Sequence, residues 1–267
     1  EDAADAEEIE ADQLKGRVAF ENVTFAFRRP DGELDPPALK GIDLTVEPGE
    51  RIGILGATGA GKSALVNLVP RFYEATEGRI TIDGHDVRDI PQDQLREIVG
   101  IALQEAMLFQ GDVRFNLKFG AQEAEDKQMF EAAKAADAHG FVTGLPETWG
   151  APVARRGYNF SGGQRQRLSI ARTLTAAPQV LILDDSTSAL DVATESRVQA
   201  AIPELYEGIT TIYIAQRISA VIDLDRIVLM ENGEITAIGT HEELLASSPL
   251  YQEIYESQLG GVEEEKA

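Results

Sequence analysis

A glycine-rich segment that ends in lysine and serine is the first part of this sequence with a clear chemical use. It fits the pattern G-x-x-x-x-G-K-[S/T], follows the short apolar run Arg51 to Leu55, and precedes a stretch that we expect to be helical from Lys62. Glycines let backbone N–H groups turn inward around phosphate oxygens, at the positive end of the following helix. The predicted phosphate-binding residues are Gly56, Ala57, Thr58, Gly59, Ala60, Gly61, Lys62 and Ser63.

The same segment and one distant aspartate predict a magnesium site. Lys62 is placed to bridge terminal phosphates, and the Ser63 hydroxyl is a suitable Mg²⁺ ligand. Asp184 ends the buried-strand pattern Val180 to Leu183, where its carboxylate can face the same ion. A strand-terminal aspartate can also simply cap a turn, but the presence of Lys62 and Ser63 in the glycine-rich segment favours the metal role.

The run Asn159 to Arg167 (Asn-Phe-Ser-Gly-Gly-Gln-Arg-Gln-Arg) resembles the signature motif of ATP-binding-cassette (ABC) ATPases. The resemblance covers nearly all of residues 17–258 and implies ATP and Mg²⁺ as cofactors, an ATPase activity and a head-to-tail dimer that encloses two ATP molecules. In such a dimer the signature contacts the γ-phosphate bound by the partner, and its N–H groups at a helix start form a second anion site. The corresponding residues here are Ser161, Gly162, Gly163 and Gln164.

The resemblance assigns roles to three more positions. Gln104 matches the glutamine that senses Mg²⁺ and links the core to the helical lobe, and Asp191 belongs to a loop that reaches across the dimer. Phe27 matches the aromatic residue, usually tyrosine, that stacks on adenine. Stacking on a base contributes roughly 1–3 kcal/mol and needs only a ring face, so phenylalanine can serve. The alternative for Phe27 is an ordinary strand-core ring.

Two positions depart from the family pattern. Asp185 stands where the general base is glutamate, and Gln216 stands where the switch residue is histidine. One methylene less shortens the reach by about 1.5 Å, and misplacing a base by that much can lower the rate around 10²-fold. Glutamine can bond a γ-phosphate but cannot change charge near neutral pH. We therefore expect Asp185 and Gln216 to form a weakly hydrolytic site, as in the degenerate half of a heterodimeric exporter whose signature completes the partner's site.

Several segments resemble exporter-type cassettes, which implies docking to the coupling helices of a transmembrane domain at the cytoplasmic face of the cell membrane. Arg155-Arg156-Gly157 departs from the pattern, because this loop normally carries glutamate. Two alternatives remain open: an ordinary homodimeric exporter domain in which Asp185 still acts as base, and a non-transport ABC regulator that uses ATP only to clamp. The exporter-like segments are 71–73, 104–109, 112–117 and 251–258.

The alternation of strand and helix patterns predicts the elements that position these residues. We expect an α/β fold: a P-loop NTPase core with a mixed sheet and helices, an antiparallel β subdomain, and an inserted α-helical subdomain at about 105–176. Trp149 and Met107 are predicted to pack in that lobe and at its edge, and His139 to end a helix. The predicted strands are 17–27, 39–46, 51–55, 79–82, 98–103, 180–183, 210–214, 227–230 and 234–238, and the clearest helices are 126–138, 193–205 and one from Thr240.

Composition excludes several classes of protein. The formal charge is −22; residues 1–13 hold seven acids and no base, and without these residues and the acidic tail the body still carries −13. Such a field repels nucleic acid, because phosphate binding needs clustered Lys and Arg. The chain has no cysteine, no apolar run of about 18 residues and an acidic start unlike a secretory signal. We expect an acidic linker at 1–15, the nucleotide-binding domain at 16–259 and an acidic tail at 260–267.

Overall fold

The computed structural model describes residue 9 and residues 14–259. An antiparallel sheet forms one layer of the protein. Its strand order is β2-β1-β4-β5. In β1 the residues Val18, Phe20, Val23 and Phe25 are all buried, as the alternating pattern predicts, although register shifts interrupt the pairing with β2. The strands are β1 (Val18–Phe25), β2 (Leu39–Val46), β4 (Glu77–Ile82) and β5 (His85–Asp86).

A second, six-stranded sheet lies beside the first and has the order β12-β11-β3-β10-β9-β6. All its neighbouring strands run parallel except the edge pair β11 and β12. Strands β9 and β10 are buried along their whole length, which explains their continuous apolar sequence. The strands are β3 (Arg51–Leu55), β6 (Val99–Ala102), β9 (Val180–Asp184), β10 (Thr210–Ala215), β11 (Arg226–Glu231) and β12 (Glu234–Gly239).

Helix α1 (Lys62–Asn67) follows β3 and joins the two sheets. Its Leu65 and Val66 are fully buried in one apolar cluster with residues of β1, β2, β3, β4, β9 and β10. The carboxyl ends of β3 and β9 and the start of α1 therefore meet at one edge of the central sheet. This is where open α/β sheets bind ligands.

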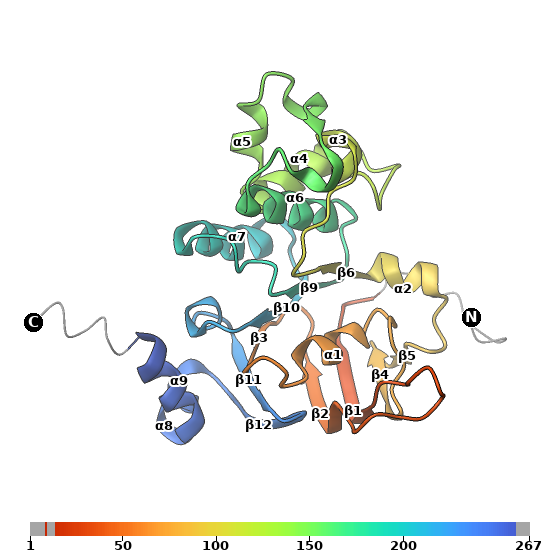
Figure 1. Cartoon of the computed structure of the whole chain (residues 1–267), viewed down its shortest axis with the longest axis vertical. Coiled ribbons are helices and arrows are strands. Elements are labelled where there is room, and N and C mark those ends of the chain that lie inside the picture. The colour runs from red at the N-terminus through yellow and green to blue at the C-terminus, as the bar shows by residue number, and fades with distance from the viewer. Residues whose placement is uncertain (1–8, 10–13, 260–267) are drawn as a thin grey trace, which may run out of the picture.

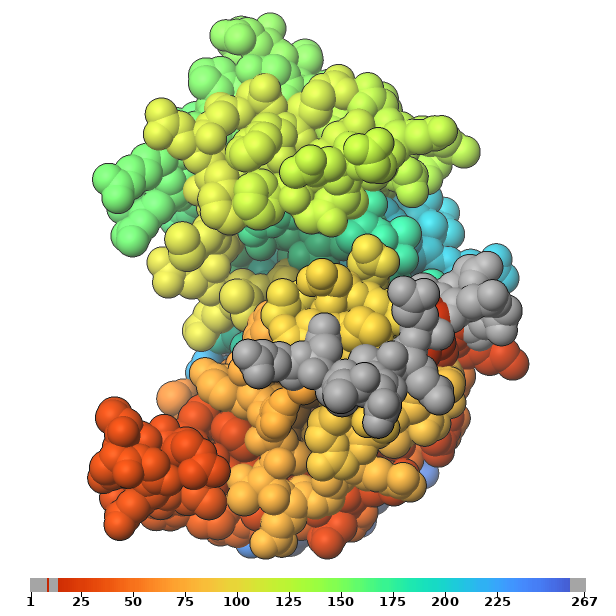
Figure 2. Space-filling view, turned by 90° about the vertical axis from the view of Figure 1, so that its right-hand side faces the viewer, coloured from red at the N-terminus to blue at the C-terminus, as the bar shows by residue number. Residues whose placement is uncertain are grey.

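A helical lobe is inserted between β6 and β9 and stands above the sheets in Figure 1. Helices α4 and α6 pack closely against each other, and the buried face of α4 includes Met129 and Ala132. Figure 2 shows the lobe as a separate mass above the sheet layers, with helix α2 below it. The elements of the lobe are α3 (Val113–Leu117), α4 (Asp126–Ala135), α5 (His139–Thr143), α6 (Gly162–Thr175), and the short strands β7 (Gly111–Asp112) and β8 (Pro152–Val153).

The remaining helices flank the central sheet: α2 (Gln92–Ile98), α7 (Val192–Leu205), α8 (His241–Ser247) and α9 (Pro249–Leu259). Within the described residues, no helix combines the length and the apolar character needed to cross a membrane. The predicted acidic segments fall almost wholly on residues 1–8, 10–13 and 260–267, outside the described part. Leu14 is described, and it is buried in the apolar core.

Two local predictions were wrong, one helix was missed, and one prediction was confirmed. Helix α2 was not predicted at all; His139 begins α5 instead of ending a helix; and the side chain of Met107 is 45% exposed. Arg172 donates a hydrogen bond to the Met107 carbonyl at 2.9 Å, so the backbone is anchored while the side chain points outward. Trp149 does pack in the lobe, with its ring 4.8 Å from that of Phe130.

Replacing Ile182 by alanine should destabilise the whole domain. Ile182 is fully buried at the centre of β9, between Ile101 and Ile212 on the neighbouring strands. We expect the free energy of unfolding to fall by about 2–5 kcal/mol, because truncation leaves a cavity. Urea denaturation measures this, with Ile238→Ala on the exposed face of β12 as control. The control should cost less than about 1 kcal/mol; equal losses would contradict the central place of β9.

Candidate nucleotide-binding site

The predicted phosphate-binding loop, residues 56–61, lies between β3 and α1. Gly59 and Gly61 have φ of 85° and 100°, a region that favours glycine. A Cβ on Gly56 would lie 2.4 Å from the Met230 carbonyl oxygen, so a side chain there would force the loop away from β11. The Lys62 ammonium donates to the carbonyl oxygens of Gly56 and Ala57 at 2.7 and 2.9 Å, which curls the loop around it. Burial lowers the pKa of Lys62, and the carboxylates of Asp185 and Asp184 oppose that shift.

Ser63 and Asp184 come together although they lie far apart in the sequence. The Ser63 hydroxyl donates to Asp184 Oδ1 at 3.0 Å. Burial raises the pKa of Asp184, and the Ser63 hydrogen bond offsets part of that rise. A nearby cation would relieve this cost of burial.

The donor set suits Mg²⁺ bound together with phosphate. Among the described residues, no group of three or more His, Cys, Asp or Glu side chains could by itself hold a metal ion. One hydroxyl and one carboxylate are nonetheless the type of incomplete set that Mg²⁺ accepts, since it usually keeps waters and takes phosphate oxygens. Ser63 and Asp184 therefore fit the predicted ion.

Asp185 is held by two glutamines, Gln104 and Gln216, which the resemblance assigned to the nucleotide site. Gln104 Nε2 and Gln216 Nε2 each donate to Asp185 Oδ2, both at 3.0 Å. Asp185 has φ of 47°, a left-handed conformation that aspartate tolerates better than most residues. Burial raises the pKa of its carboxyl, and the Gln216 hydrogen bond opposes the rise. The loops that follow β9, β6 and β10 thus supply Asp185, Gln104 and Gln216, which are joined by hydrogen bonds.

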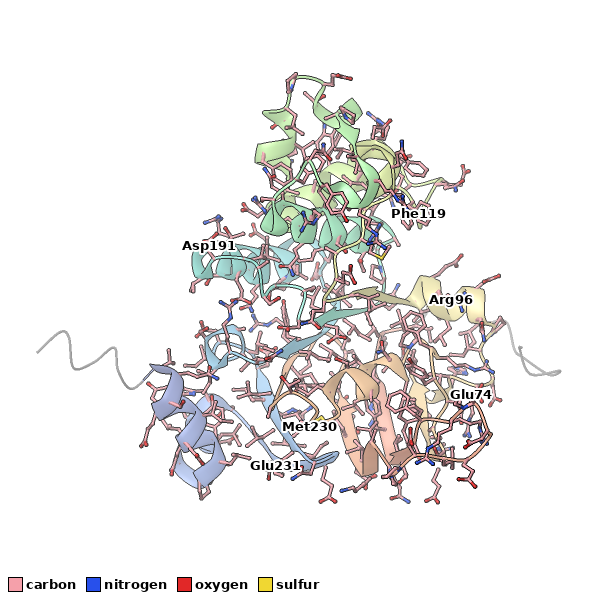
Figure 3. All side chains as sticks on the ribbon, in the orientation of Figure 1. Glu74, Arg96, Phe119, Asp191, Met230 and Glu231 are labelled. Atoms are coloured by element: carbon pink, nitrogen blue, oxygen red, sulfur yellow. The ribbon has the colours of Figure 1, made fainter. Side chains whose placement is uncertain are left out.

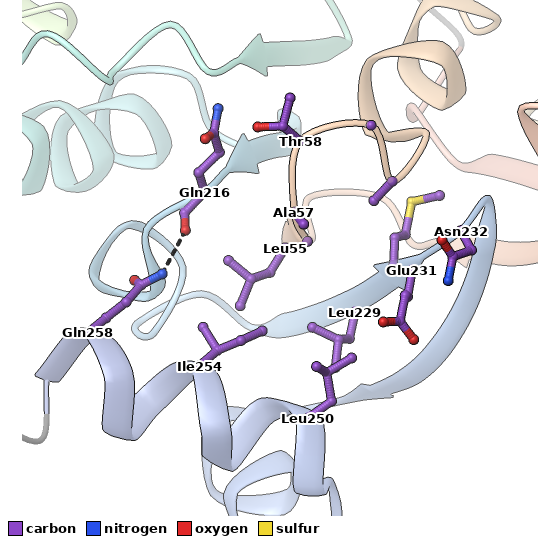
Figure 4. Close-up of a pocket in the computed structure, with 14 residues that line it drawn as sticks. Leu55, Ala57, Thr58, Gln216, Leu229, Glu231, Asn232, Leu250, Ile254 and Gln258 are labelled. Carbon is purple, nitrogen blue, oxygen red and sulfur yellow. Dashed lines mark hydrogen bonds between the residues drawn. The ribbon is translucent and has the colours of Figure 1, made fainter.

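A cleft of about 410 Å³ opens beside the phosphate-binding loop. In Figure 4 the loop and Gln216 lie above the cleft, and Leu250 and Ile254 of α9 lie below it. Residues of β11 line the cleft between them. Polar atoms of the loop and Gln216 therefore face one side of the cleft, and apolar side chains of α9 face the other.

The signature residues lie on the lobe, at the N-terminus of α6, apart from the phosphate-binding loop of the same chain. Ser161 Oγ accepts from Gln164 N at 3.2 Å, while Gln164 Oε1 accepts from Ser161 N at 2.9 Å, which closes a capping box. The N–H groups of the α6 first turn include those of Gly162 and Gly163. Figure 3 places Asp191 at the start of α7, below the lobe, where its carboxylate accepts from Thr194 N and caps that helix.

Phe27 lies two residues beyond the end of β1, outside the antiparallel sheet, although the strand was predicted to reach it, and its side chain is 40% exposed. Its ring centroid is 4.8 Å from that of Phe25 and 5.4 Å from that of Tyr73. The three rings border a cleft of about 450 Å³ that is lined by residues 25–28, Leu34 and residues 73–76. An exposed ring face is therefore present, and adenine stacking stays a prediction.

Sequence reasoning missed three residues that support the site. Glu195 of α7 is buried and accepts from Thr187 and, at 2.9 Å, from Arg217. Gln166 of α6 accepts from Ala189 N at 2.9 Å and so ties the loop before α7 to the signature helix. Gln258 Nε2 donates a hydrogen bond to the carbonyl oxygen of Gln216. Gln166 stood in the signature run and Gln258 in a segment that resembled exporters, but no local pattern distinguished the role of either.

The arrangement defines a P-loop ATPase domain: a glycine loop before α1, a strand-terminal carboxylate beside its serine, and a helical insertion with a capped signature helix. The sequence profile described as "ABC transporter" matches residues 39–188. The chain belongs to the ABC transporter family.

Relatives and solved structures agree with this assignment. The chain is 42% identical over 253 residues to the ATP-dependent lipid A-core flippase of Syntrophus aciditrophicus (strain SB), covering 95% of this chain and 41% of that protein. It is 44% identical over 250 residues to the ABC transporter ATP-binding protein YfiB of Bacillus subtilis (strain 168), covering 94% and 43%. A structure of a bacterial Atm1-family ABC exporter with ATP bound superposes with a TM-score of 0.89 at 36% identity, covering 97% of this chain and 44% of that one. The chain therefore spans less than half the length of these proteins.

Proposed function

We propose that this chain is the ATP-binding domain of an ABC exporter and that it binds ATP with Mg²⁺ at the loop between β3 and α1. Backbone N–H groups of residues 56–61 and the Lys62 ammonium bind the phosphates, while Ser63, Asp184 and Gln104 hold the ion. Mg²⁺ neutralises charge that develops on the phosphates during transfer. Phe27 stacks on the adenine. The relatives with exporter functions and the Ser63–Asp184 contact of 3.0 Å support this assignment.

We also propose that hydrolysis of ATP at this chain's own site is slow. The observation that carries it is the double hydrogen bond to Asp185 Oδ2 from Gln104 and Gln216. A short carboxylate fixed by two neutral amides reaches less far toward an attacking water than glutamate would, and Gln216 cannot gain charge. Bound ATP would then remain for long periods and act chiefly to hold a dimer together.

The partner that fits this proposal is a second, non-identical nucleotide-binding domain in head-to-tail orientation. Ser161, Gly163 and Gln164 would contact the γ-phosphate on the partner, since the capped start of α6 presents N–H groups. Asp191 and its loop would reach across the same interface. The signature is intact here, so most hydrolysis would take place in the site that it completes.

Docking to a transmembrane domain has its own structural support. Phe109, Phe115 and Phe119 form an exposed aromatic surface on the lobe, with Phe109 and Phe119 stacked at 4.1 Å and Met107 exposed nearby in the sequence. Exposed apolar groups gathered in this way are typical of protein interfaces. We propose that they receive the coupling helices, which would place the domain at the cytoplasmic face of a membrane.

Replacing Asp185 by alanine tests the slow-site proposal. Together with the partner half-transporter, Asp185→Ala should lower ATP turnover less than about threefold, while removing the partner's general base should lower it about 10²-fold or more. Steady-state phosphate release measures both. Asp185→Ala that abolishes turnover as completely as the partner's substitution would overturn the asymmetry.

A symmetric exporter is the second candidate, and the similarity to the lipid A-core flippase favours it. In that case Asp185 acts as base in two equivalent sites. The chain alone would then hydrolyse ATP cooperatively, and Asp185→Ala would stop it.

A further inference from the structure

The loop that follows β10 depends on the last turn of the C-terminal helix. We define the switch loop as residues 216–218, which leave the sheet after Ala215 and carry the Gln216 side chain toward Asp185. Gln258 Nε2 donates to the Gln216 carbonyl oxygen at 3.0 Å, and Ile218 N donates to Gln258 Oε1 at 2.8 Å. One amide thus bonds the backbone on both sides of Arg217, and Figure 4 shows the first of these bonds reaching from α9.

The side chain of Arg217 is held from the opposite direction. Its guanidinium donates to Glu195 Oε2 on α7 at 2.9 Å, and the Glu195 side chain is only 4% exposed. Helix α7 therefore fixes the side chain in the middle of the switch loop, while α9 fixes the backbone around it. The direction of the Gln216 side chain follows from this backbone.

Helix α9 is well seated for such a role. Tyr251 is fully buried, and its hydroxyl is 2.8 Å from His241 Nδ1. Leu250 and Ile254 pack on the apolar cluster and line the cleft beside the phosphate-binding loop. A helix anchored in this way can hold a glutamine at a fixed distance from the switch loop.

We propose that Gln258 is a positioning residue that sets the orientation of Gln216 from the C-terminal helix. Through Gln216 it also sets the hydrogen bond to Asp185 Oδ2. The inference rests on the proposed function in one respect: Gln216 must act on the nucleotide for its orientation to affect turnover. The structural part of the inference, that Gln258 restrains the switch loop, is independent of the reaction.

Hydrogen–deuterium exchange of a peptide covering residues 214–221 tests the restraint directly. Gln258→Ala should speed exchange of the Ile218 amide about 3- to 10-fold, the range expected for one or two lost hydrogen bonds. Gln258→Glu keeps the acceptor for Ile218 N and should leave that amide near its wild-type rate. Gln252→Ala is the matched control, because Gln252 lies on the same helix but donates to the Leu245 carbonyl. Unchanged exchange in Gln258→Ala, or an equal rise in the Gln252 control, would overturn the proposal.

Turnover of bound ATP gives the second readout. Gln258→Ala should lower single-turnover hydrolysis about 3- to 10-fold, with Gln258→Glu between it and wild type, while the Kd for ATP changes less than twofold. A parallel loss of ATP affinity would indicate a general structural role and overturn positioning. If wild-type turnover by the chain alone is fast and Asp185→Ala stops it, the slow-site proposal fails, while the exchange result still decides the role of Gln258.

Discussion

Lys62→Ala should nearly abolish ATP binding by the isolated chain while leaving the fold intact. The ammonium lies inside the curve of the phosphate-binding loop, bonded to the Gly56 and Ala57 carbonyl oxygens. Phosphate oxygens would replace these carbonyls as its partners, and a buried charge contact of this kind contributes about 2–5 kcal/mol. The Kd for ATP with Mg²⁺ should therefore rise roughly 30- to 4000-fold. Isothermal titration calorimetry measures it.

A lysine outside the site provides the matched control for this change. Lys127 on α4 is 78% exposed and lies 3.9 Å from Glu131, a surface pair that contributes little. Lys127→Ala should leave ATP affinity unchanged, and circular dichroism should be the same for both variants. An ATP affinity of Lys62→Ala within threefold of wild type would show that the loop does not bind phosphate as proposed.

Most of the candidate phosphate and metal site is recognisable in the sequence because each part is defined locally. Residues 56–63 are contiguous, and Asp184 ends an apolar run whose burial on both faces is evident from its composition. Parallel strands bring their carboxyl ends to one edge of a sheet, so the contact between Ser63 and Asp184 follows from the strand assignment.

The parts that could not be predicted depend on contacts between distant residues. Helix α4 ends at Ala135, and Asp137 then turns with φ of 52° while Arg167 donates to its carbonyl oxygen at 2.8 Å. This arginine lies on α6, so the sequence around residue 137 gave no sign that His139 would start a new helix. Helix α2 was missed for a different reason: it is short and buries only Leu95 and Ile98, too few positions for a helical period.

The same distinction applies to the residues around Asp185. Its identity is evident in the sequence, but the two amides that bond it come from loops 81 and 31 residues away. Glu195, Gln166 and Gln258 are likewise recognisable only through their partners. Residues that hold the side chains of a site in place are therefore harder to predict than residues that would contact the ligand, because polar side chains on helix surfaces have many possible partners.

Asp185→Glu should raise ATP turnover about 10²-fold in our proposal, since the longer side chain restores the reach of a general base. Gln104 and Gln216 are already in place to orient the new carboxylate, and its backbone keeps the turn after β9. Phosphate release from the chain alone, with saturating ATP and Mg²⁺, measures the effect.

The same substitution one residue earlier should have the opposite effect, which makes it a sharp control. Asp184 is 6% exposed and lies 3.0 Å from the Ser63 hydroxyl, so there is little space for another methylene. Asp184→Glu would displace the carboxylate that we propose binds the metal, and so lower turnover. If turnover rises for Asp185→Glu and falls for Asp184→Glu, then the reach of the carboxylate at 185 toward the water limits the rate. A general effect of glutamate on charge or acidity would be the same at both positions. A fall in turnover for Asp185→Glu would instead mean that aspartate already has the length this site needs, and the symmetric exporter would be the better assignment.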